Sequence, residues 1–385
     1  MTSRITWGAA SARRLERQYL DTPAETGTPL ADVVSAMLAA HAQVLSAAEV
    51  SVGVRAAGRT RADVRAALWD EAGSPASLLK THGPRGTVHL LPARELPLWS
   101  AALAAIPGAG RFAPDIRLTD DRAARVVAAI ADGLDGATLT IDELDEAVVA
   151  RTDPWAGDRV MPAFQDLWPR RRQVLHRAGQ SGALCFGPNR GRKVTYTRPP
   201  RFAPLPTTEA LRLLVRRYLR AYGPATPQDF AKWLAAPGSW ATGLFESFAG
   251  EREGGTEEVD FEGTRAWVAA GDTAFPEEPV RGVRLLPYFD AYVIAAQPRE
   301  VLFPGAAYRR APAGGRAGDY PVLLVDGVVA GVWHQRRQGR RTTVTVEPLG
   351  RLTARHEREL GERVGQVLQA RPELVIGKVT SGPHA

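Results

Sequence analysis

The first hundred residues switch between helical and strand-like spacing of hydrophobic side chains. The elements predicted from this spacing are helices over 30–40, 46–57 and 60–71 and strands over 77–81 and 87–91. Ser46 and Glu49 form an S-x-x-E pattern, which predicts a capping box at the start of the second helix. Thr60 is the expected cap of the third. Helix, turn, helix and hairpin in this order describe a winged helix.

The same order recurs twice further along the chain. Thr140-Ile141-Asp142-Glu143 predicts another capping box, and Thr226 followed by Pro227 predicts a further helix start. The remaining predicted elements of these two units are helices over 120–132, 141–151, 161–177 and 208–222 and a hairpin formed by 182–186 and 193–197. The pattern therefore predicts three winged-helix units in one chain.

From about Phe275 the pattern changes to short strands separated by proline and glycine. Strands are predicted over 283–286, 291–295, 322–325, 328–333, 342–346 and 373–376, and a helix over 353–369. Asp326-Gly327 predicts a tight hairpin turn. The fold class we expect is α+β, with tandem winged-helix units and a small C-terminal β-barrel-like domain. The expected domains are 1–112, 113–203, 204–275 and 276–385.

Residues 41–45 form a junction between the first two predicted helices. In an extended junction, His41 and Gln43 project to the same side, whereas on a continuous helix they would point apart. A histidine and a glutamine aimed together can orient and polarise one water molecule. The alternative is structural, because His41 also continues an apolar stripe and a histidine of this kind is often a satisfied core residue.

Composition narrows the class of partner and cofactor. A hydrophobic share of 44% and a charged share of 24% are typical of a globular protein, and a net charge of +7 favours an anionic partner. The single cysteine, Cys185, excludes an internal disulfide, and the histidines do not follow zinc-site spacing. The sequence has no signal-peptide pattern and no apolar run of membrane-spanning length. We therefore expect a cytoplasmic protein without metal, cofactor or membrane contact.

Basic residues concentrate in the second predicted unit. Between Met161 and Phe202, nine basic residues stand against one acid, Asp166. Such a run is usually a solvated face, but here it falls on a predicted recognition helix and wing, the elements that would follow DNA phosphates. A second basic turn lies between two C-terminal strands. The candidate DNA-binding residues are Arg170, Arg171, Arg172, Arg190, Arg192, Lys193, Arg336, Arg337 and Arg340.

Five collinear segments resemble the winged-helix DNA glycosylases of the AlkZ/YcaQ type. These segments are 41–49, Arg85-Gly86-Thr87-Val88-His89-Leu90-Leu91-Pro92, 222–233, Leu285-Leu286-Pro287-Tyr288-Phe289-Asp290 and 326–333. Members of that family carry a catalytic glutamine, a spacer, and a glutamine or aspartate, so the resemblance implies His41 and Gln43 as catalytic residues. His41 departs from the usual glutamine and is similar to a variant branch with histidine there. The resemblance also implies that Arg85, Thr87 and Asp290 line the site, although Asp290 is equally suited to cap a turn.

The expected activity is hydrolysis of the N-glycosidic bond of N7-alkylated guanine in duplex DNA, bulky or crosslinked adducts included. The junction offers no carboxylate before Glu49, and a guanine alkylated at N7 is already cationic and leaves without acid assistance. We expect a monomeric, nucleoid-associated and monofunctional glycosylase without lyase activity, acting in base excision repair or in self-resistance to a genotoxin. The alternative is a non-enzymatic winged-helix transcriptional regulator, which usually needs a dedicated dimer helix.

Overall fold

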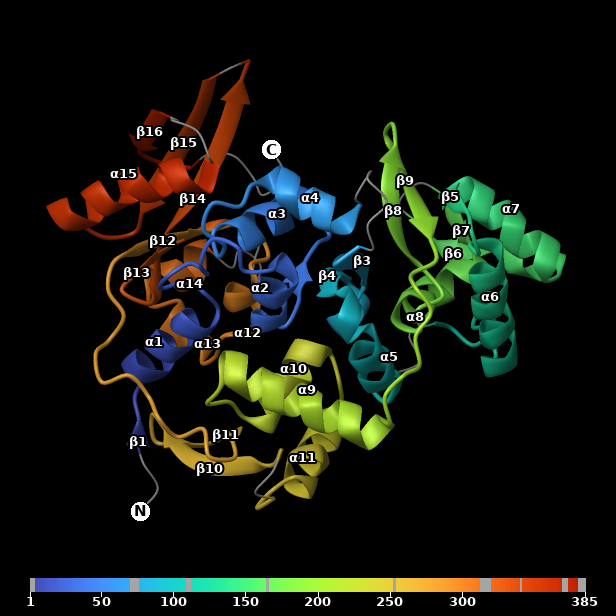
Figure 1. Ribbon diagram of the computed structural model, residues 1–385, viewed down its shortest axis with the longest axis horizontal. Helices are drawn as coiled ribbons and strands as arrows, with labels where there is room; N and C mark the ends of the chain where they lie inside the picture. The colour runs from blue at the N-terminus through green and yellow to red at the C-terminus, as the bar shows by residue number, and fades with distance from the viewer. Residues whose placement is uncertain are drawn as a thin grey trace.

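The computed structural model describes residues 4–69, 76–108, 112–163, 166–251, 254–311, 320–339, 341–368 and 373–379. The chain is 43% helical and 24% strand, which confirms the predicted mixed class. Figure 1 shows the second unit in green on one side and the C-terminal sheet in orange and red on the other. The first unit, in blue, lies between them, and the third, in yellow, lies below.

The first unit is a winged helix. Its elements are α2 (Leu30–Ala36), β2 (Ala40–His41), α3 (Leu45–Gly53), α4 (Arg61–Leu68), β3 (Leu78–His82) and β4 (Val88–Pro92). The three strands form one sheet in the order β2-β4-β3, so the strand that follows α2 is paired with the last strand of the unit. A short 3-10 turn, η1 (Pro84–Gly86), occupies the place of the wing between β3 and β4, and α5 (Leu96–Ala104) follows the sheet.

The second and third units repeat this topology. In the second, the strands are paired in the order β5-β9-β8. In the third, an isolated bridge from Ala225 to Trp267 on β11 takes the place of the first strand. The elements are α6 (Asp120–Gly133), β5 (Thr138–Thr140), α7 (Ile141–Arg151), α8 (Leu175–Gln180), β8 (Cys185–Arg190), β9 (Lys193–Thr197), α9 (Thr207–Tyr222), α10 (Pro227–Leu234), α11 (Gly238–Ser247), β10 (Thr256–Phe261) and β11 (Thr264–Ala269). The predicted threefold repeat is thus present in the hydrogen-bonding order of the strands.

Three of the predicted helix starts are capping boxes. The hydroxyl oxygens of Thr60, Thr140 and Thr226 each accept a hydrogen bond from the backbone N–H of the residue three positions later. The acidic side chain at that position accepts a hydrogen bond from the backbone N–H of the threonine. The box predicted at Ser46 is wrong, because α3 begins at Leu45 and its cap is Val44. Glu49, the predicted partner in that box, is instead buried and paired with two arginines of α4.

The helix predicted over 161–177 is wrong for most of its length. The chain forms a hairpin of β6 (Arg159–Pro162) and β7 (Leu167–Pro169), then the 3-10 helix η4 (Arg170–Val174), and only then α8. Pro162 and Pro169 explain the difference, because proline cannot donate within a helix and disfavours helical geometry in the residue before it.

The C-terminal part is a five-stranded sheet covered by a helix. Its strands are β12 (Val283–Leu286), β13 (Val322–Val325), β14 (Val328–Gln338), β15 (Arg341–Pro348) and β16 (Glu373–Ile376), paired in that order, and the helix is α15 (Ala354–Leu368). The predicted turn at Asp326-Gly327 is confirmed, with positive φ at both residues. The predicted strand 291–295 is wrong: it is the helix α12 (Ala291–Ala295), capped by Asp290. A short apolar run does not distinguish a buried helix from a strand by its spacing.

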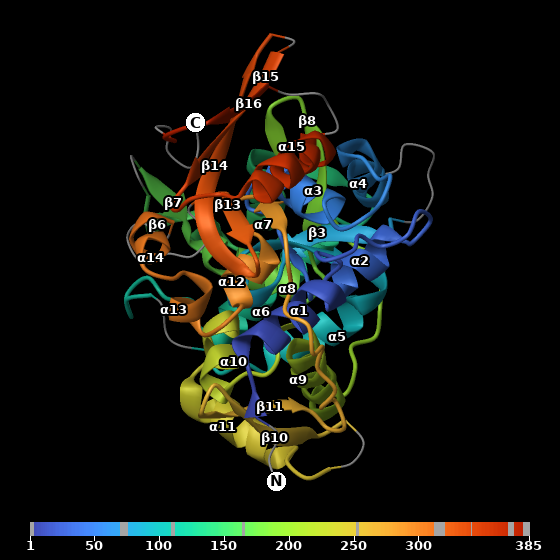
Figure 2. The same cartoon turned by 90° about the vertical axis from the view of Figure 1, so that its left-hand side faces the viewer.

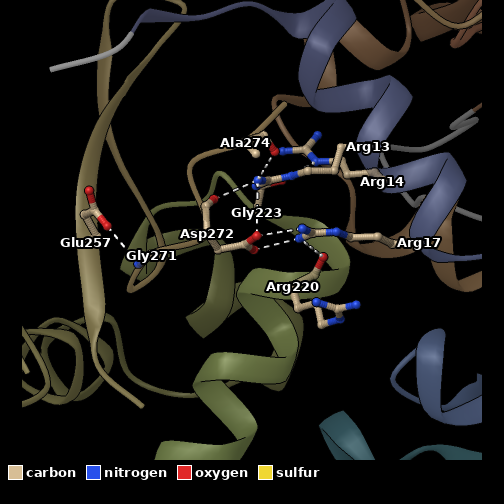
Figure 3. Close-up of polar contacts among 9 residues, drawn as sticks. All are labelled: Arg13, Arg14, Arg17, Arg220, Gly223, Glu257, Gly271, Asp272 and Ala274. Atoms are coloured by element: carbon tan, nitrogen blue, oxygen red, sulfur yellow. Dashed lines mark hydrogen bonds and ion pairs between the residues drawn. The ribbon is translucent and has the colours of Figure 1, made fainter. Parts of the chain in front are cut away.

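The N-terminal segment joins the third unit rather than the first. β1 (Arg4–Ile5) pairs in parallel with β10. On α1 (Trp7–Arg17), the guanidinium of Arg17 makes two 2.6 Å hydrogen bonds to the carboxylate of Asp272. Arg14, which is fully buried, donates to the carbonyl oxygens of Gly223 and Pro224. Figure 3 shows these arginines leaving one face of α1 toward the end of α9. α1 thus lies against the third unit, and its buried apolar residues also belong to a core shared with the C-terminal part; the domain boundaries stay predictions.

Among the residues that the structure describes, no helix is long and apolar enough to cross a membrane.

Candidate functional site

A strained backbone segment introduces the predicted catalytic pair. After α2, Leu38 and Ala39 both have positive φ, at 56° and 87°, a conformation that costs a non-glycine residue energy and is concentrated at functional sites. The hydroxyl of Tyr222, on α9, donates to the carbonyl oxygen of Met37 over 2.6 Å and holds the start of this segment. The chain then enters β2 in extended form, which confirms the predicted junction between α2 and α3.

His41 is half-buried and lies between two other rings. Its ring centroid is 5.2 Å from that of His89, at 85° between planes, and 4.8 Å from that of Phe289. His41 and His89 are directly opposite in the pairing of β2 with β4. The Nδ1 atom of His41 is buried and has no hydrogen-bond partner among the described residues. The buried Nδ1 atom of His82 is likewise without a partner, so two histidines of the first unit share this feature.

Burial, together with the nearby positive charge of Arg85, lowers the pKa of His41 to about 4. His89 is more deeply buried, and burial holds its pKa well below the ordinary value. Its Nδ1 lies 2.9 Å from the carbonyl oxygen of Thr87, so in the neutral ring this nitrogen carries the proton and donates. Both rings are therefore neutral at physiological pH, and His41 is suited to orient water rather than to store a proton.

The turn between β3 and β4 packs against the other two winged helices. Arg85, which has a φ of 61°, donates from Nη1 to the carbonyl oxygen of Trp233 on α10, over 2.7 Å. Gln180 on α8 donates to the carbonyl oxygen of Gly83. A Cβ atom on Gly83 would lie 2.9 Å from the His89 ring, so glycine is needed for this close approach. The wing of the first unit is thus a place where all three units meet next to the His41 site.

Gln43 and Thr87 complete the predicted set near His41. Gln43 is exposed and lies in the bend that follows β2, two residues beyond His41. Thr87 is half-buried and its hydroxyl donates to the carbonyl oxygen of Pro84. Its side chain therefore stabilises the turn that carries Arg85.

Asp290 has a structural role. Its carboxylate is fully buried, accepts two 2.8 Å hydrogen bonds from Arg55 and one of 2.6 Å from Ser51, and caps α12. A carboxylate that is neutralised in this way does not face a substrate cation, so of the two predicted roles the structure favours the cap. The preceding residue, Phe289, has a φ of 54° and contacts His41. The ion pair consequently fixes the aromatic wall of the site.

The predicted DNA-binding residues differ in accessibility. Arg336 and Arg337 are exposed near the end of hairpin β14–β15, and Arg190, Arg192 and Lys193 are exposed at hairpin β8–β9. Figures 1 and 2 show both hairpins projecting toward the same end of the molecule. Arg340 lies outside the described residues. Arg190 and Lys193 are paired at the surface with Glu143 and Asp142.

Arg170, Arg171 and Arg172 do not form a basic helix face. Arg170 donates to the carbonyl oxygen of Ile116, and Arg172 lies over the ring of Trp168. Arg171 is fully buried and paired with Asp145. It has no surface to offer a phosphate, so we replace its predicted DNA contact by a structural role.

Sequence reasoning missed the residues that surround His41. His89 and Phe289 both lie in segments that resemble the glycosylase family, but only their neighbours are predicted as site residues. The pairing of the first and last strands in a winged helix is the signal that places His89 opposite His41. No comparable sequence signal connects Phe289 to β2.

Three winged helices arranged around one buried polar turn define a tandem winged-helix protein. A family model described as DNA glycosylase AlkZ-like matches residues 34–370. An interstrand DNA cross-link repair glycosylase from Streptomyces sahachiroi is 32% identical over 356 residues, which are 86% of this chain and 88% of that protein. The structure of the DNA glycosylase AlkZ from the same organism has a TM-score of 0.77 at 28% identity, covering 97% of this chain and 100% of that chain. The chain belongs to the AlkZ-like DNA glycosylase family.

Proposed function

We propose that this DNA glycosylase hydrolyses the bond between C1′ and N9 of N7-alkylated guanine in duplex DNA, with His41 and Gln43 orienting the attacking water. The observation that supports the proposal most is the His41 ring, which is half-buried, has its pKa lowered to about 4 and lies two residues before the exposed Gln43. The carboxylates nearest in the sequence motifs, Glu49 and Asp290, are both neutralised by arginines. This arrangement suits a leaving group that needs no acid.

The charge balance of the reaction agrees with such a site. An N7-alkylated guanine carries a positive charge, and it leaves as a neutral base when the bond to C1′ breaks. The water oxygen then bonds to C1′, and one proton is released. Because burial lowers the pKa of His41 to about 4, this ring does not retain the proton, which passes to solvent. The products are an abasic site, the free alkylated base and one proton.

We further propose that bulky and crosslinked N7 adducts are substrates, that the enzyme is monofunctional, and that it acts as a monomer on chromosomal DNA. The name of the Streptomyces sahachiroi relative supports the first point. Within the described part of the chain, the groups that contact His41 or influence its pKa are imidazole, phenyl and guanidinium, and none of these three is the primary amine that a lyase step requires.

The experiment that tests the proposal is single-turnover release of 7-methylguanine, and of a bulkier N7-guanine adduct, from duplex DNA. We expect release of the free base followed by strand cleavage only after alkali. Cleavage without alkali would contradict the monofunctional assignment. Absence of release from every N7-alkylated duplex, combined with tight binding to one undamaged sequence, would favour a transcriptional regulator instead.

The pH profile tests the neutral state of His41. Because its pKa is lowered to about 4, the rate of base release should be constant from about pH 5.5 to 8 and fall only below that range, as the ring becomes protonated. A histidine with an ordinary pKa would instead give a fall near pH 6.5. Arg85→Met removes the positive charge that helps to lower the pKa of His41, so the decrease in rate should begin at a higher pH.

Protein stability must be measured alongside that profile. The buried histidines have lower pKa values in the folded than in the unfolded chain, so the unfolded chain binds more protons as the pH falls below 6.5. The contribution of the neutral histidines to the free energy of unfolding is therefore fully present above pH 6.5 and is lost as the pH falls toward 4. A rate that follows the folded fraction would report unfolding rather than protonation of His41.

Hairpin β14–β15 provides a test of phosphate binding. The double variant R336A/R337A should weaken binding to all DNA sequences alike and reduce the slope of log affinity against log salt by about 1 for each phosphate that is no longer neutralised. The matched control is R355A/R358A, which removes the same charge from α15. Equal slopes for the two variants would show that only net charge matters.

A further inference from the structure

The hairpin β6–β7 exposes two large apolar side chains. Leu167 is 42% and Trp168 is 46% exposed, whereas most large apolar residues of the described chain are buried. Both lie on β7, the strand just before η4. Single exposed apolar residues are common on protein surfaces, but here two large ones are adjacent on one short strand. The hairpin therefore needs an explanation other than packing.

The indole of Trp168 is positioned by two neighbouring residues of the second unit. The guanidinium carbon of Arg172 lies 5.3 Å from its ring centroid, in cation–π contact. Trp168 is paired with Met161 across the hairpin, so these two side chains share a face, and Met161 is buried. One side of the ring is thus supported while a large part of it stays in solvent. A fixed, half-exposed ring of this kind is a preformed stacking surface.

A short, continuous connection links this ring to the His41 site. η4 and α8 follow β7 directly, and Gly86, in the turn beside His89, packs on His176 of α8. With rises of about 2.0 Å per residue in a 3-10 helix, about 1.5 Å in an α-helix and about 3.3 Å in a strand, the chain from Trp168 to His176 spans at most roughly 20 Å. The contact with Gly86, the chain from Gly86 to His89 and the pairing of His89 with His41 add about 20 Å more. At about 3.4 Å per nucleotide along a strand, the whole path corresponds to at most about twelve nucleotides.

We propose that Trp168 stacks on an unstacked nucleobase of the DNA that the enzyme holds at His41, within about twelve nucleotides of the lesion. Aromatic side chains stack on any base through its π face, and flanking arginines neutralise the backbone. Arg159 and Arg172 supply positive charge beside the ring, although Arg159 is paired with Asp166. Leu167, next to it, is suited to wedge against the neighbouring base step. The inference rests on the proposed function only in assuming that DNA is bound at His41; it does not depend on the reaction that His41 and Gln43 carry out.

The test is equilibrium binding to duplexes that carry one 2-aminopurine at successive positions up to about twelve nucleotides on either side of an N7-methylguanine. For the wild type we expect the fluorescence of 2-aminopurine to change on binding at one position or at two adjacent ones. Trp168→Ala should abolish that change and weaken binding about tenfold, which is within the range for loss of one base–aromatic stack. Trp168→Phe keeps a ring and should stay within about threefold of the wild type. If Trp168→Ala lowers the folded fraction, Trp168→Leu, which keeps an apolar side chain without a π face, replaces it.

Two results would overturn the inference. The first is binding and fluorescence of Trp168→Ala equal to those of the wild type. The second is loss of self-association in sedimentation experiments without loss of DNA affinity, which would make a second copy of the chain the partner of this hairpin. Failure of the wild type to release any base would refute the proposed function, but stacking would still be tested by affinity and fluorescence.

Discussion

His41→Ala should lower the single-turnover rate of 7-methylguanine release by about 10²–10⁴-fold, the usual contribution of a positioned group that acts on water. His41 is held by its pairing with His89 and by contact with Phe289, so its removal leaves the surrounding backbone in place. Affinity for undamaged duplex DNA should stay near the wild-type value. The measurements are product release under enzyme excess and a binding titration on the same oligonucleotide.

Two further variants separate chemistry from packing. Gln43→Ala removes an exposed side chain and should lower the rate without changing stability. His41→Gln introduces the residue that is usual in the family and should retain more activity than His41→Ala. The assignment would be refuted by a His41→Ala enzyme whose rate and DNA affinity fall together by the same factor, because that pattern indicates general damage to the fold.

Asp290→Ala should have the largest effect on stability. It leaves the guanidinium of Arg55 fully buried without its carboxylate, and breaking one side of a buried pair costs about 3–5 kcal/mol. It also removes the cap of α12 and so loosens Phe289 beside His41. We therefore expect a lower free energy of unfolding in denaturant titrations and a lower rate of base release.

The surface pair of Arg94 with Asp32 is the matched control. Both side chains are about half-exposed, at 52% and 46%, and such pairs contribute only about 0–1 kcal/mol. Asp32→Ala should therefore be nearly neutral. The double replacement Arg55→Met with Asp290→Leu should recover much of the lost stability, because it removes both buried charges. Recovery of stability without recovery of activity would show that the cap on α12 matters for catalysis.

The sequence is sufficient for the parts of the fold that local rules determine. Thr60, Thr140 and Thr226 each begin a helix because a hydroxyl and an acid three residues later satisfy free backbone groups, and this signal does not depend on the rest of the protein. The strand prediction for 291–295 fails because the state of this run is decided by Asp290, whose capping role depends on a distant arginine. Ser51 and Asp290, which bond directly, are 239 residues apart.

The candidate site can be proposed from the sequence, but its electrostatics cannot. The motif indicates His41 and Gln43, and their catalytic roles stay a prediction. The neutral state of His41 depends on burial by β4 and Phe289, which no local pattern encodes. Likewise, the run Arg170-Arg171-Arg172 shows its charge in the sequence but not its accessibility, and Arg171 is inside the unit.

The contact between Phe289 and His41 has a consequence for biosynthesis. His41 leaves the ribosome early in synthesis, but Phe289, which forms one wall of its pocket, is made much later. Asp290, the buried partner of Arg55, is made immediately after Phe289. A nascent or truncated chain that ends before β12 therefore carries the motif without a formed pocket. Base removal should begin only when synthesis has passed this point, so incomplete translation products should not create abasic sites in the chromosome.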